Sequence, residues 1–295
     1  MKTKKLAITF AILAAALYAI NVPISKLLMQ HISATMMAAF LYLGAGTGML
    51  IYVGITKTVG KKSKKESLTR KELPYTIAMV VLDIIAPILL MMGIANTNSA
   101  NVSLLNNFEI VATSLIALII FKEAISRKLW IAIGLVVVAS AILSFEGMGA
   151  FSFNKGSLLV LGACICWGFE NNCTKMISNK SSEEIVIIKG IFSGLGSFIV
   201  ALVIGESIPP LRWILGALIL GFVSYGLSIN FYIMAQKDLG AAKTSAYYSI
   251  APFLGVTFSM LLVGERPAGQ FYIALIIMIV STIIMVKDTI DLQLS

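Results

Sequence analysis

The sequence predicts an all-α integral membrane protein with ten transmembrane helices, arranged as two inverted five-helix repeats with both termini in the cytoplasm. Three observations support this prediction: the composition is 58% hydrophobic and 13% charged, long apolar runs recur along the chain, and basic residues gather in alternate loops. Ordinary soluble domains are about 25% charged. The composition therefore excludes an ordinary soluble domain.

Ten apolar runs account for most of the chain, and each, at about 20 residues, can cross a hydrocarbon core of about 30 Å. The first run follows a basic start, as in a signal peptide, but it continues past Ala19, which favours a membrane helix. The expected helices are Leu6–Met29, Ser33–Thr56, Pro74–Ala95, Ala100–Phe121, Leu129–Phe145, Ser157–Ser178, Glu184–Ile204, Trp213–Ala235, Ala241–Val263 and Phe271–Val286.

The basic residues predict the orientation of these helices. If the N-terminus is inside, the inner loops hold most of the Lys and Arg, including the cluster from Thr56 to Lys71, and the outer side keeps little beyond Lys155, Arg212 and Arg266. Inner loops of membrane proteins carry this excess, so we expect a multi-pass protein of the cell membrane with cytoplasmic termini. The net charge of +9 then reflects orientation in the lipid bilayer, with anionic lipid as a second use of the basic cluster, and we exclude nucleic-acid binding.

Weak internal repetition divides the chain into two units, residues 1–149 and 150–295. Laying Y-A-I-N-V-P-I-S-K from Tyr18 on W-G-F-E-N-N-C-T-K from Trp167 places Asn21 on Glu170. Further on, Ala100 falls on Ala242 and Ser103 on Ser245, in a register changed by the longer basic loop of the first unit. Five helices per unit is an odd number, so the second unit enters the membrane from the opposite side. Inverted repeats are typical of secondary transporters.

Each unit also closes on an apolar helix that ends in glutamate, in N-N-F-E-I-V-A-T-S-L-I-A-L-I-I-F-K-E and Y-Y-S-I-A-P-F-L-G-V-T-F-S-M-L-L-V-G-E. These segments resemble the paired EamA domains of the drug/metabolite transporter superfamily over nearly the whole chain. The resemblance implies a ten-helix carrier of small metabolites. One departure is Ile110, where the family commonly has proline, whereas the second unit keeps Pro252; we therefore expect a helix break in the second unit alone.

The three deepest charges are all acidic: Asp83, Glu109 and Glu170. Intramembrane carboxyl groups are costly and usually face protein or water, so they are candidates for a proton or cation site. The alternative is that each is protonated, or bonded to neighbouring Asn and Ser, and serves packing. The basic residues Lys26, Lys175 and Lys189 lie near predicted helix ends, from which their long stems are expected to carry the charge to the interface.

Helical spacing places polar and aromatic side chains beside these acids. Trp167, Glu170 and Thr174 share one face, and Ser103, Asn106, Glu109 and Thr113 share another. Aromatic side chains there would suit a planar or cationic solute, although each is equally expected as core filling. Besides the three acids, the candidate solute-binding or coupling residues are Asn21, Asn106, Asn107, Asn171, Tyr18, Trp167, Tyr225, Tyr248 and Ser245.

The sequence offers little support for a metal site, a cofactor, an ATP-driven step or enzyme catalysis. The chain has 1 His and 3 Cys and lacks a phosphate-binding G-x-x-x-x-G-K-[ST] loop, so we expect no metal, no cofactor and no ATP-driven step. The remaining enzyme hypothesis pairs Asp83 with Glu109 or Glu170, and a non-transporting scaffold or sensor is a third class. The favoured function is a secondary carrier of a small organic solute such as an amino acid or amine, with protons or another ion as coupling partner, acting as a monomer or homodimer.

Overall fold

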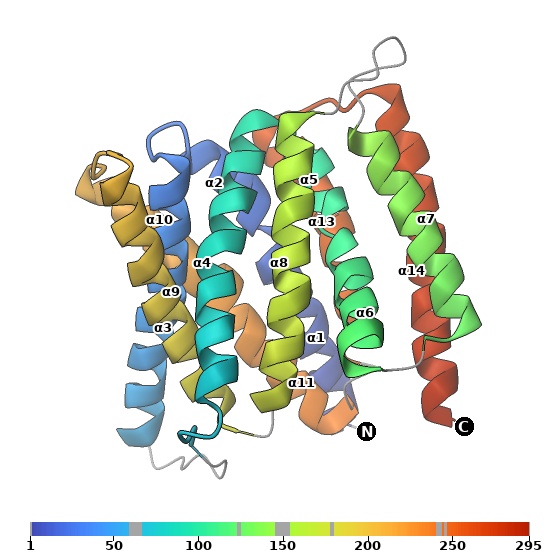
Figure 1. Ribbon diagram of the computed structural model, residues 1–295, viewed down its shortest axis with the longest axis horizontal. Coiled ribbons are helices and arrows are strands. Elements are labelled where there is room, and N and C mark those ends of the chain that lie inside the picture. Colours follow the sequence, from blue (N-terminus) through green and yellow to red (C-terminus); the bar gives the residue numbers. More distant parts are fainter. Residues whose placement is uncertain are drawn as a thin grey trace.

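The computed structural model describes residues 2–58, 67–122, 125–144, 154–177, 180–239, 244 and 247–294, and these residues form an upright bundle of helices (Figure 1). The helices are α1 (Lys2–Ala19), α2 (Asn21–Leu28), α3 (Ala34–Thr58), α4 (Leu73–Asn96), α5 (Ser99–Leu105), α6 (Phe108–Phe121), α7 (Arg127–Ser144), α8 (Lys155–Ile177), α9 (Ser182–Val203), α10 (Leu211–Gly221), η1 (Phe222–Leu227), α11 (Ser228–Leu239), α13 (Ala251–Phe258), η2 (Ser259–Val263) and α14 (Gly269–Leu294). Both termini lie at the same end of the bundle, the lower end in Figure 1.

Eight helical segments among the described residues are long and apolar enough to cross a membrane. The sequence predicted ten crossings. The two further predicted crossings correspond to α8, which has 23 residues, and to the shorter apolar helix Ala251–Val263. In α8 the run from Glu170 to Thr174 lowers the hydropathy of an otherwise apolar helix. The basic cluster expected between the second and third crossings lies largely outside the described residues.

Several crossings are interrupted within their length. The chain turns at Asn106 and Asn107, between α5 and α6, and again at Ser249 and Ile250, before α13. The expectation of a break in the second unit alone is therefore wrong. In the first unit the Asn107 side-chain amide donates to the Leu104 carbonyl at 3.1 Å, and such local bonds compete with the helical ladder without any proline. Each half of the chain thus contains at least one broken helix, and the first crossing is interrupted as well, at Ile20 between α1 and α2.

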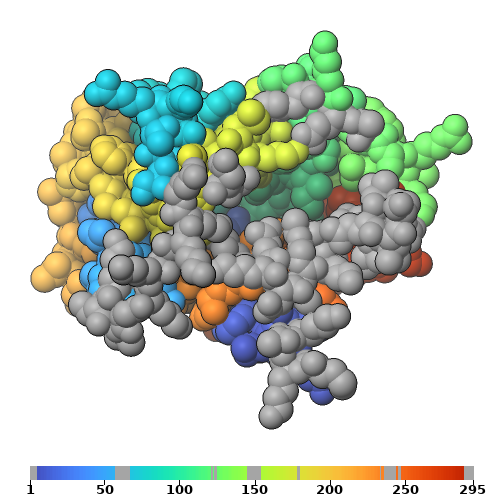
Figure 2. All heavy atoms as spheres, turned by 90° about the horizontal axis from the view of Figure 1, so that it is seen from below, coloured from blue at the N-terminus to red at the C-terminus, as the bar shows by residue number. Residues whose placement is uncertain are grey.

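Glycine contacts hold two helix pairs at very short separation. A Cβ atom on Gly190 of α9 would lie 2.3 Å from the Gly46 backbone nitrogen of α3, and a Cβ on Gly156 of α8 would lie 2.9 Å from the Gly93 carbonyl oxygen of α4. Small residues of this kind let membrane helices approach backbone to backbone. The most extensive contacts in the bundle are accordingly α4 with α8 and α3 with α9, followed by α7 with α14 and α1 with α11. Figure 2 shows the lower end, with α9 and α10 at one edge and α7 and α14 at the other.

Two glutamates from the second half of the chain cap helices of the first half at the upper end. Glu265 accepts hydrogen bonds from the Ser99 backbone nitrogen at 3.0 Å, the Ser99 hydroxyl at 2.7 Å and the Ala100 nitrogen at 3.1 Å, at the start of α5. Glu206 accepts from the Ser33 hydroxyl at 2.6 Å and the Met36 nitrogen at 2.8 Å, at the start of α3. A carboxylate is stabilised at a helix N-terminus by the unpaired N–H groups and the helix dipole. These caps join the two halves at this end.

Glu265→Ala is expected to lower the free energy of unfolding by about 1–2 kcal/mol, because the start of α5 loses all three accepted bonds. For a protein of this size the melting temperature in detergent should fall by about 2–8 °C. The melting temperature of Glu265→Gln, which keeps an acceptor oxygen, should fall by less. A melting temperature unchanged in Glu265→Ala would show that the cap contributes nothing to stability.

Candidate functional site

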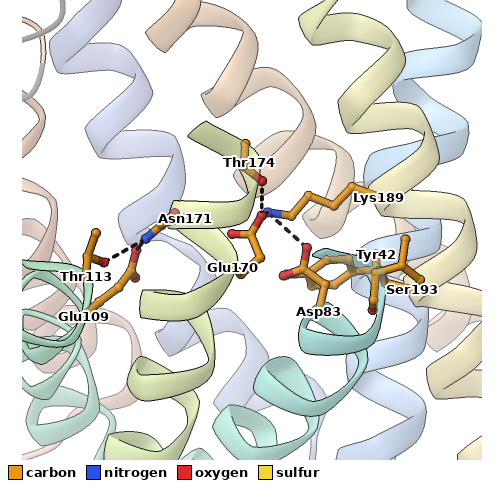
Figure 3. Close-up of polar contacts among 10 residues, drawn as sticks. Tyr42, Asp83, Glu109, Thr113, Glu170, Asn171, Thr174, Lys189 and Ser193 are labelled. Atoms are coloured by element: carbon orange, nitrogen blue, oxygen red, sulfur yellow. Dashed lines mark hydrogen bonds and ion pairs between the residues drawn. The ribbon is translucent and has the colours of Figure 1, made fainter. Parts of the chain in front are cut away.

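Two consecutive residues of α8, Glu170 and Asn171, reach into two different polar clusters (Figure 3). Glu170 points toward α4 and α9, and Asn171 points toward α6. Adjacent helical positions are about 100° apart, which is why one helix can serve two neighbours at the same height. Helix α8 therefore carries the polar centre of the bundle.

The first cluster is a buried group of one ammonium and two carboxylates. The Lys189 Nζ atom lies 3.1 Å from Asp83 Oδ2 and 3.0 Å from Glu170 Oε1 (Figure 3). The exposed fractions of the side chains are 0% for Asp83, 2% for Glu170 and 17% for Lys189. The Tyr42 hydroxyl donates to Asp83 Oδ1 at 3.0 Å, and the Thr174 hydroxyl donates to Glu170 Oε1. With all three groups ionised, the cluster has a net charge of −1.

The placement of Lys189 overturns the expectation that this side chain carries its charge to the interface. Helix α9 begins at Ser182, with Ser181 as its N-cap, so Lys189 is about 10 Å along the helix. The inference that the deepest charges are all acidic is wrong for the same reason. Buried carboxylates need a counter-charge, so the prediction of three buried acids without a basic residue already indicated a missing basic partner. Tyr42 was missed as well, since nothing local distinguishes it from a packing residue.

The second cluster joins α6 to α8. The Asn171 side-chain amide donates to Glu109 Oε1 at 2.7 Å and to the Thr113 hydroxyl at 3.3 Å. The Asn172 amide donates to the Thr113 carbonyl at 3.1 Å. Because the chain breaks just before α6, Glu109 lies in the first turn of that helix, where the helix dipole favours a carboxylate. Glu109 therefore has a neutral partner, the Asn171 amide, whereas Glu170 has a charged partner, the Lys189 ammonium.

Aromatic residues form a third group, on the side of the site made by α1, η1 and the segment before α13. The Tyr18 ring lies 5.9 Å from Tyr225 and 6.0 Å from Tyr248, measured between ring centroids. The Asn21 amide donates to the Tyr225 hydroxyl at 3.1 Å. The Tyr42 ring, 5.3 Å from Tyr225, connects this group to the ion cluster. The rings pack on one another at edge-to-face and tilted angles that aromatic pairs favour.

Two spaces adjoin these groups. A partly open cavity of about 190 Å³ lies between α6, α8 and the start of α7. It is lined by Thr113, Ser114, Ala117, Ile125, Leu129, Asn171, Asn172 and Lys175. A much smaller space of about 10 Å³ separates Tyr42, Lys189 and Tyr225. The larger cavity reaches the Asn171 side chain that binds Glu109, so solvent entering it approaches the second cluster.

Most of the predicted site residues meet in these groups. Asp83 and Glu170 share Lys189, Glu109 meets Asn171, and Tyr18, Asn21, Tyr225 and Tyr248 form the aromatic side. Asn106 and Asn107 lie at the break between α5 and α6, and Asn106 Oδ1 has no hydrogen-bond partner among the described residues. Trp167 is buried on α8, one turn before Glu170. Ser245 lies outside the described residues.

Two carboxyl groups are thus brought to one place, the condition that an intramembrane aspartyl-type enzyme would need. They are bridged by an ammonium, however, and Glu109 belongs to the other cluster. Within the described part of the chain, no three His, Cys, Asp and Glu side chains are grouped so as to hold a metal ion.

Comparison with known proteins relates the whole chain to transporters. The EamA-like transporter family model matches residues 5–145 and 154–287. An uncharacterized transporter of Methanothermobacter thermautotrophicus is 24% identical over an alignment of 271 residues that covers 86% of this chain and 78% of the relative. A solved crystal structure aligns with a TM-score of 0.66 at 13% identity, over 97% of this chain and 98% of its own, and shows a shared fold.

Proposed function

This chain belongs to the EamA-like transporter family, is a multi-pass membrane transporter, and on that premise we propose that it moves a small organic solute across the cell membrane by alternating access. The observation that carries the proposal is the buried ion cluster at the meeting of α4, α8 and α9. Charged groups are expensive inside a bilayer and usually mark solute or ion pathways. The solute is a small metabolite, such as an amino acid or an amine.

The proposed architecture has ten crossings in two inverted repeats, residues 1–149 and 150–295, with both termini in the cytoplasm. The contact pattern supports it. In the proposed repeat, α1 corresponds to α8 and α4 to α11, so the contact of α1 with α11 corresponds to the contact of α8 with α4. Helix α3 corresponds to α9 and α7 to α14, and in each of these two pairs the equivalent helices contact each other. Both termini at one end of the bundle agree with an even number of crossings. In such carriers the solute site lies between the repeats, near the middle of the membrane.

The proposed mechanism couples the solute to a proton or another cation at the buried acids. Asp83 comes from the first half of the chain and Glu170 and Lys189 from the second, so their contacts cross the boundary between the halves. Glu109 and Asn171 cross it too. The tyrosines and Asn21 then form the neutral side of the solute site. Relative movement of the helices around these groups changes which of them reaches water.

The test of solute binding is a thermal-shift screen of the purified protein in detergent against amino acids, amines, nucleosides and sugars. A ligand that binds the folded protein stabilises it, by about 2.7 kcal/mol when the ligand concentration is 100 times its Kd, and therefore raises the melting temperature. A hit should disappear in Glu170→Gln and persist in Glu183→Gln, the same change in the first turn of α9. A hit retained fully in Glu170→Gln would place the solute elsewhere. The absence of any hit across the panel would favour a solute outside the tested classes, or the scaffold or sensor.

A further inference from the structure

We propose that Asp83 and Glu170 form a two-carboxylate cation site whose occupant in this structure is Lys189, a tethered ammonium that a free monovalent cation replaces during transport. The replacing charge is a proton or the ammonium group of a solute. The inference rests on the proposed function, because replacement requires the helices around the site to move relative to one another.

The two carboxylates stand on helices that are packed to move together. Asp83 lies on α4 and Glu170 on α8, the pair with the most extensive contact in the bundle. Gly93 and Gly156 bring the two helices together, since the nearest atom of the other helix would lie 2.6 Å from a Cβ on Gly93 and 2.8 Å from a Cβ on Gly156. Separating α4 from α8 would open this interface. The two acids therefore stay together through a conformational change.

Lys189 belongs to a different closely packed pair. Its helix α9 packs chiefly against α3, where Gly190 faces Gly46, and to a lesser extent against α4. The ammonium reaches Glu170 with the full length of its side chain, from a helix that is not a main neighbour of α8. A shift of α3 and α9 relative to α4 and α8 withdraws this ammonium without separating either glycine-packed pair.

The charges make withdrawal of Lys189 depend on another cation. The titratable groups that act on Asp83 are Tyr42 from α3, Glu170 from α8, Lys189 from α9 and Tyr225 from η1, and Glu109 from α6 also acts on Glu170. On α2, Lys26 donates instead to the Ile94 and Thr97 carbonyls at the upper end of α4. With Lys189 gone, the two buried carboxylates would keep hydroxyl donors at most, Thr174 on α8 and Tyr42 on the shifting helix α3. Two like charges in one buried site cannot both stay ionised without a counter-charge. A positive charge must therefore enter as Lys189 leaves, and an anion has no place there.

The site can be tested without a known solute by chemical rescue of Lys189→Ala. Alanine removes three methylene groups and the ammonium, which together are n-propylammonium. The melting temperature of Lys189→Ala in detergent should fall about 5–10 °C below that of the wild type. Propylammonium chloride should restore at least half of that fall, whereas 1-propanol, which has the same shape and no charge, should restore none. Lys71→Ala, an exposed lysine just before α4, is the matched control and should respond to neither.

A pH series separates the two sources of positive charge. Acidification from about pH 8 to about pH 5 should stabilise Lys189→Ala if protons fill the site, because neutral carboxyls need no counter-charge. Rescue by propylammonium assigns the site to an ammonium group, and rescue by acid alone assigns it to protons; either supports the proposal. The triple variant Lys189→Ala/Asp83→Asn/Glu170→Gln should respond to neither. An equal response of the triple variant, or no rescue by either treatment, overturns the proposal.

Two further results keep the test decisive. If Lys189→Ala does not fold, the pH series is measured on Lys189→Met, which keeps the side-chain volume. Its response is compared with that of the triple variant Lys189→Met/Asp83→Asn/Glu170→Gln. Rescue depends on binding and not on transport. Rescue in a protein that moves no solute in proteoliposomes would therefore overturn the carrier and keep the cation site, while solute transport without rescue would overturn the cation site and keep the carrier.

Discussion

In proteoliposomes, Glu170→Gln is expected to lower pH-gradient-driven accumulation of the solute by more than about tenfold, an effect of at least 1.4 kcal/mol on the coupled step. The glutamine keeps an oxygen for the Thr174 hydroxyl but cannot hold a proton or a cation in exchange. Lys189 retains Asp83 at 3.1 Å, so no buried charge is left without a partner. The variant should therefore fold.

The measurement is uptake of the solute found by the binding screen, with and without an imposed pH gradient. Solute exchange without a gradient should fall as well, because Glu170→Gln is expected to lose solute binding in the thermal-shift screen. Glu183→Gln serves as the control and should match the wild type in both assays. Gradient-driven accumulation at the wild-type rate in Glu170→Gln would remove Glu170 from the coupling machinery.

Gly190→Leu is expected to prevent stable folding, or to lower the melting temperature by more than about 10 °C. A Cβ atom there would lie 2.3 Å from the Gly46 nitrogen, 2.5 Å from the Gly46 Cα and 2.8 Å from the Tyr42 carbonyl oxygen. All three are backbone atoms of α3, so no side chain can move aside to make room. Helix α9 would have to move away from α3 and take Lys189 with it.

Gly134→Leu on α7 is the matched control, because nothing lies within 4 Å of a Cβ atom at that position. Its melting temperature should stay within a few degrees of the wild type. The readout is the fraction of monodisperse protein in detergent, followed by thermal unfolding of what is recovered. Wild-type stability of Gly190→Leu would show that the contact between α3 and α9 is looser than this geometry.

Much of the fold follows from apolar periodicity, because a bilayer leaves few alternatives to an apolar helix of about 20 residues. The sequence predicted part of the site, because Glu170, Glu109 and Asp83 lie deep within their predicted helices. Lys189 was not, since distance from a predicted helix end says little when that end is uncertain by a turn. Helix α9 begins at Ser182 rather than at Glu184, and its partners lie far away in sequence.

The break at Asn106 and Asn107 was missed for a different reason. The family pattern drew attention to proline, and proline is one of several ways to interrupt a helical ladder. Two adjacent asparagines with a local side-chain bond do so here. The partnership of Asp83 with Tyr42 could not be inferred either, because it depends on how α3 and α4 are rotated about their axes.

The two crossings that the proposed repeat relates are chemically unequal. In the alignment that places Asn21 on Glu170, and Ala100 on Ala242, Asp83 falls on Tyr225. The ionic contact of Glu170 and Asp83 through Lys189 thus corresponds to a neutral hydrogen bond from Asn21 to Tyr225. Two identical halves would make the inward-open and outward-open forms mirror partners of equal energy. In the proposed alternating-access cycle one form disturbs an ion pair and the other a neutral bond, so we expect the two end states to differ in energy and the charged crossing to set the resting orientation of the carrier.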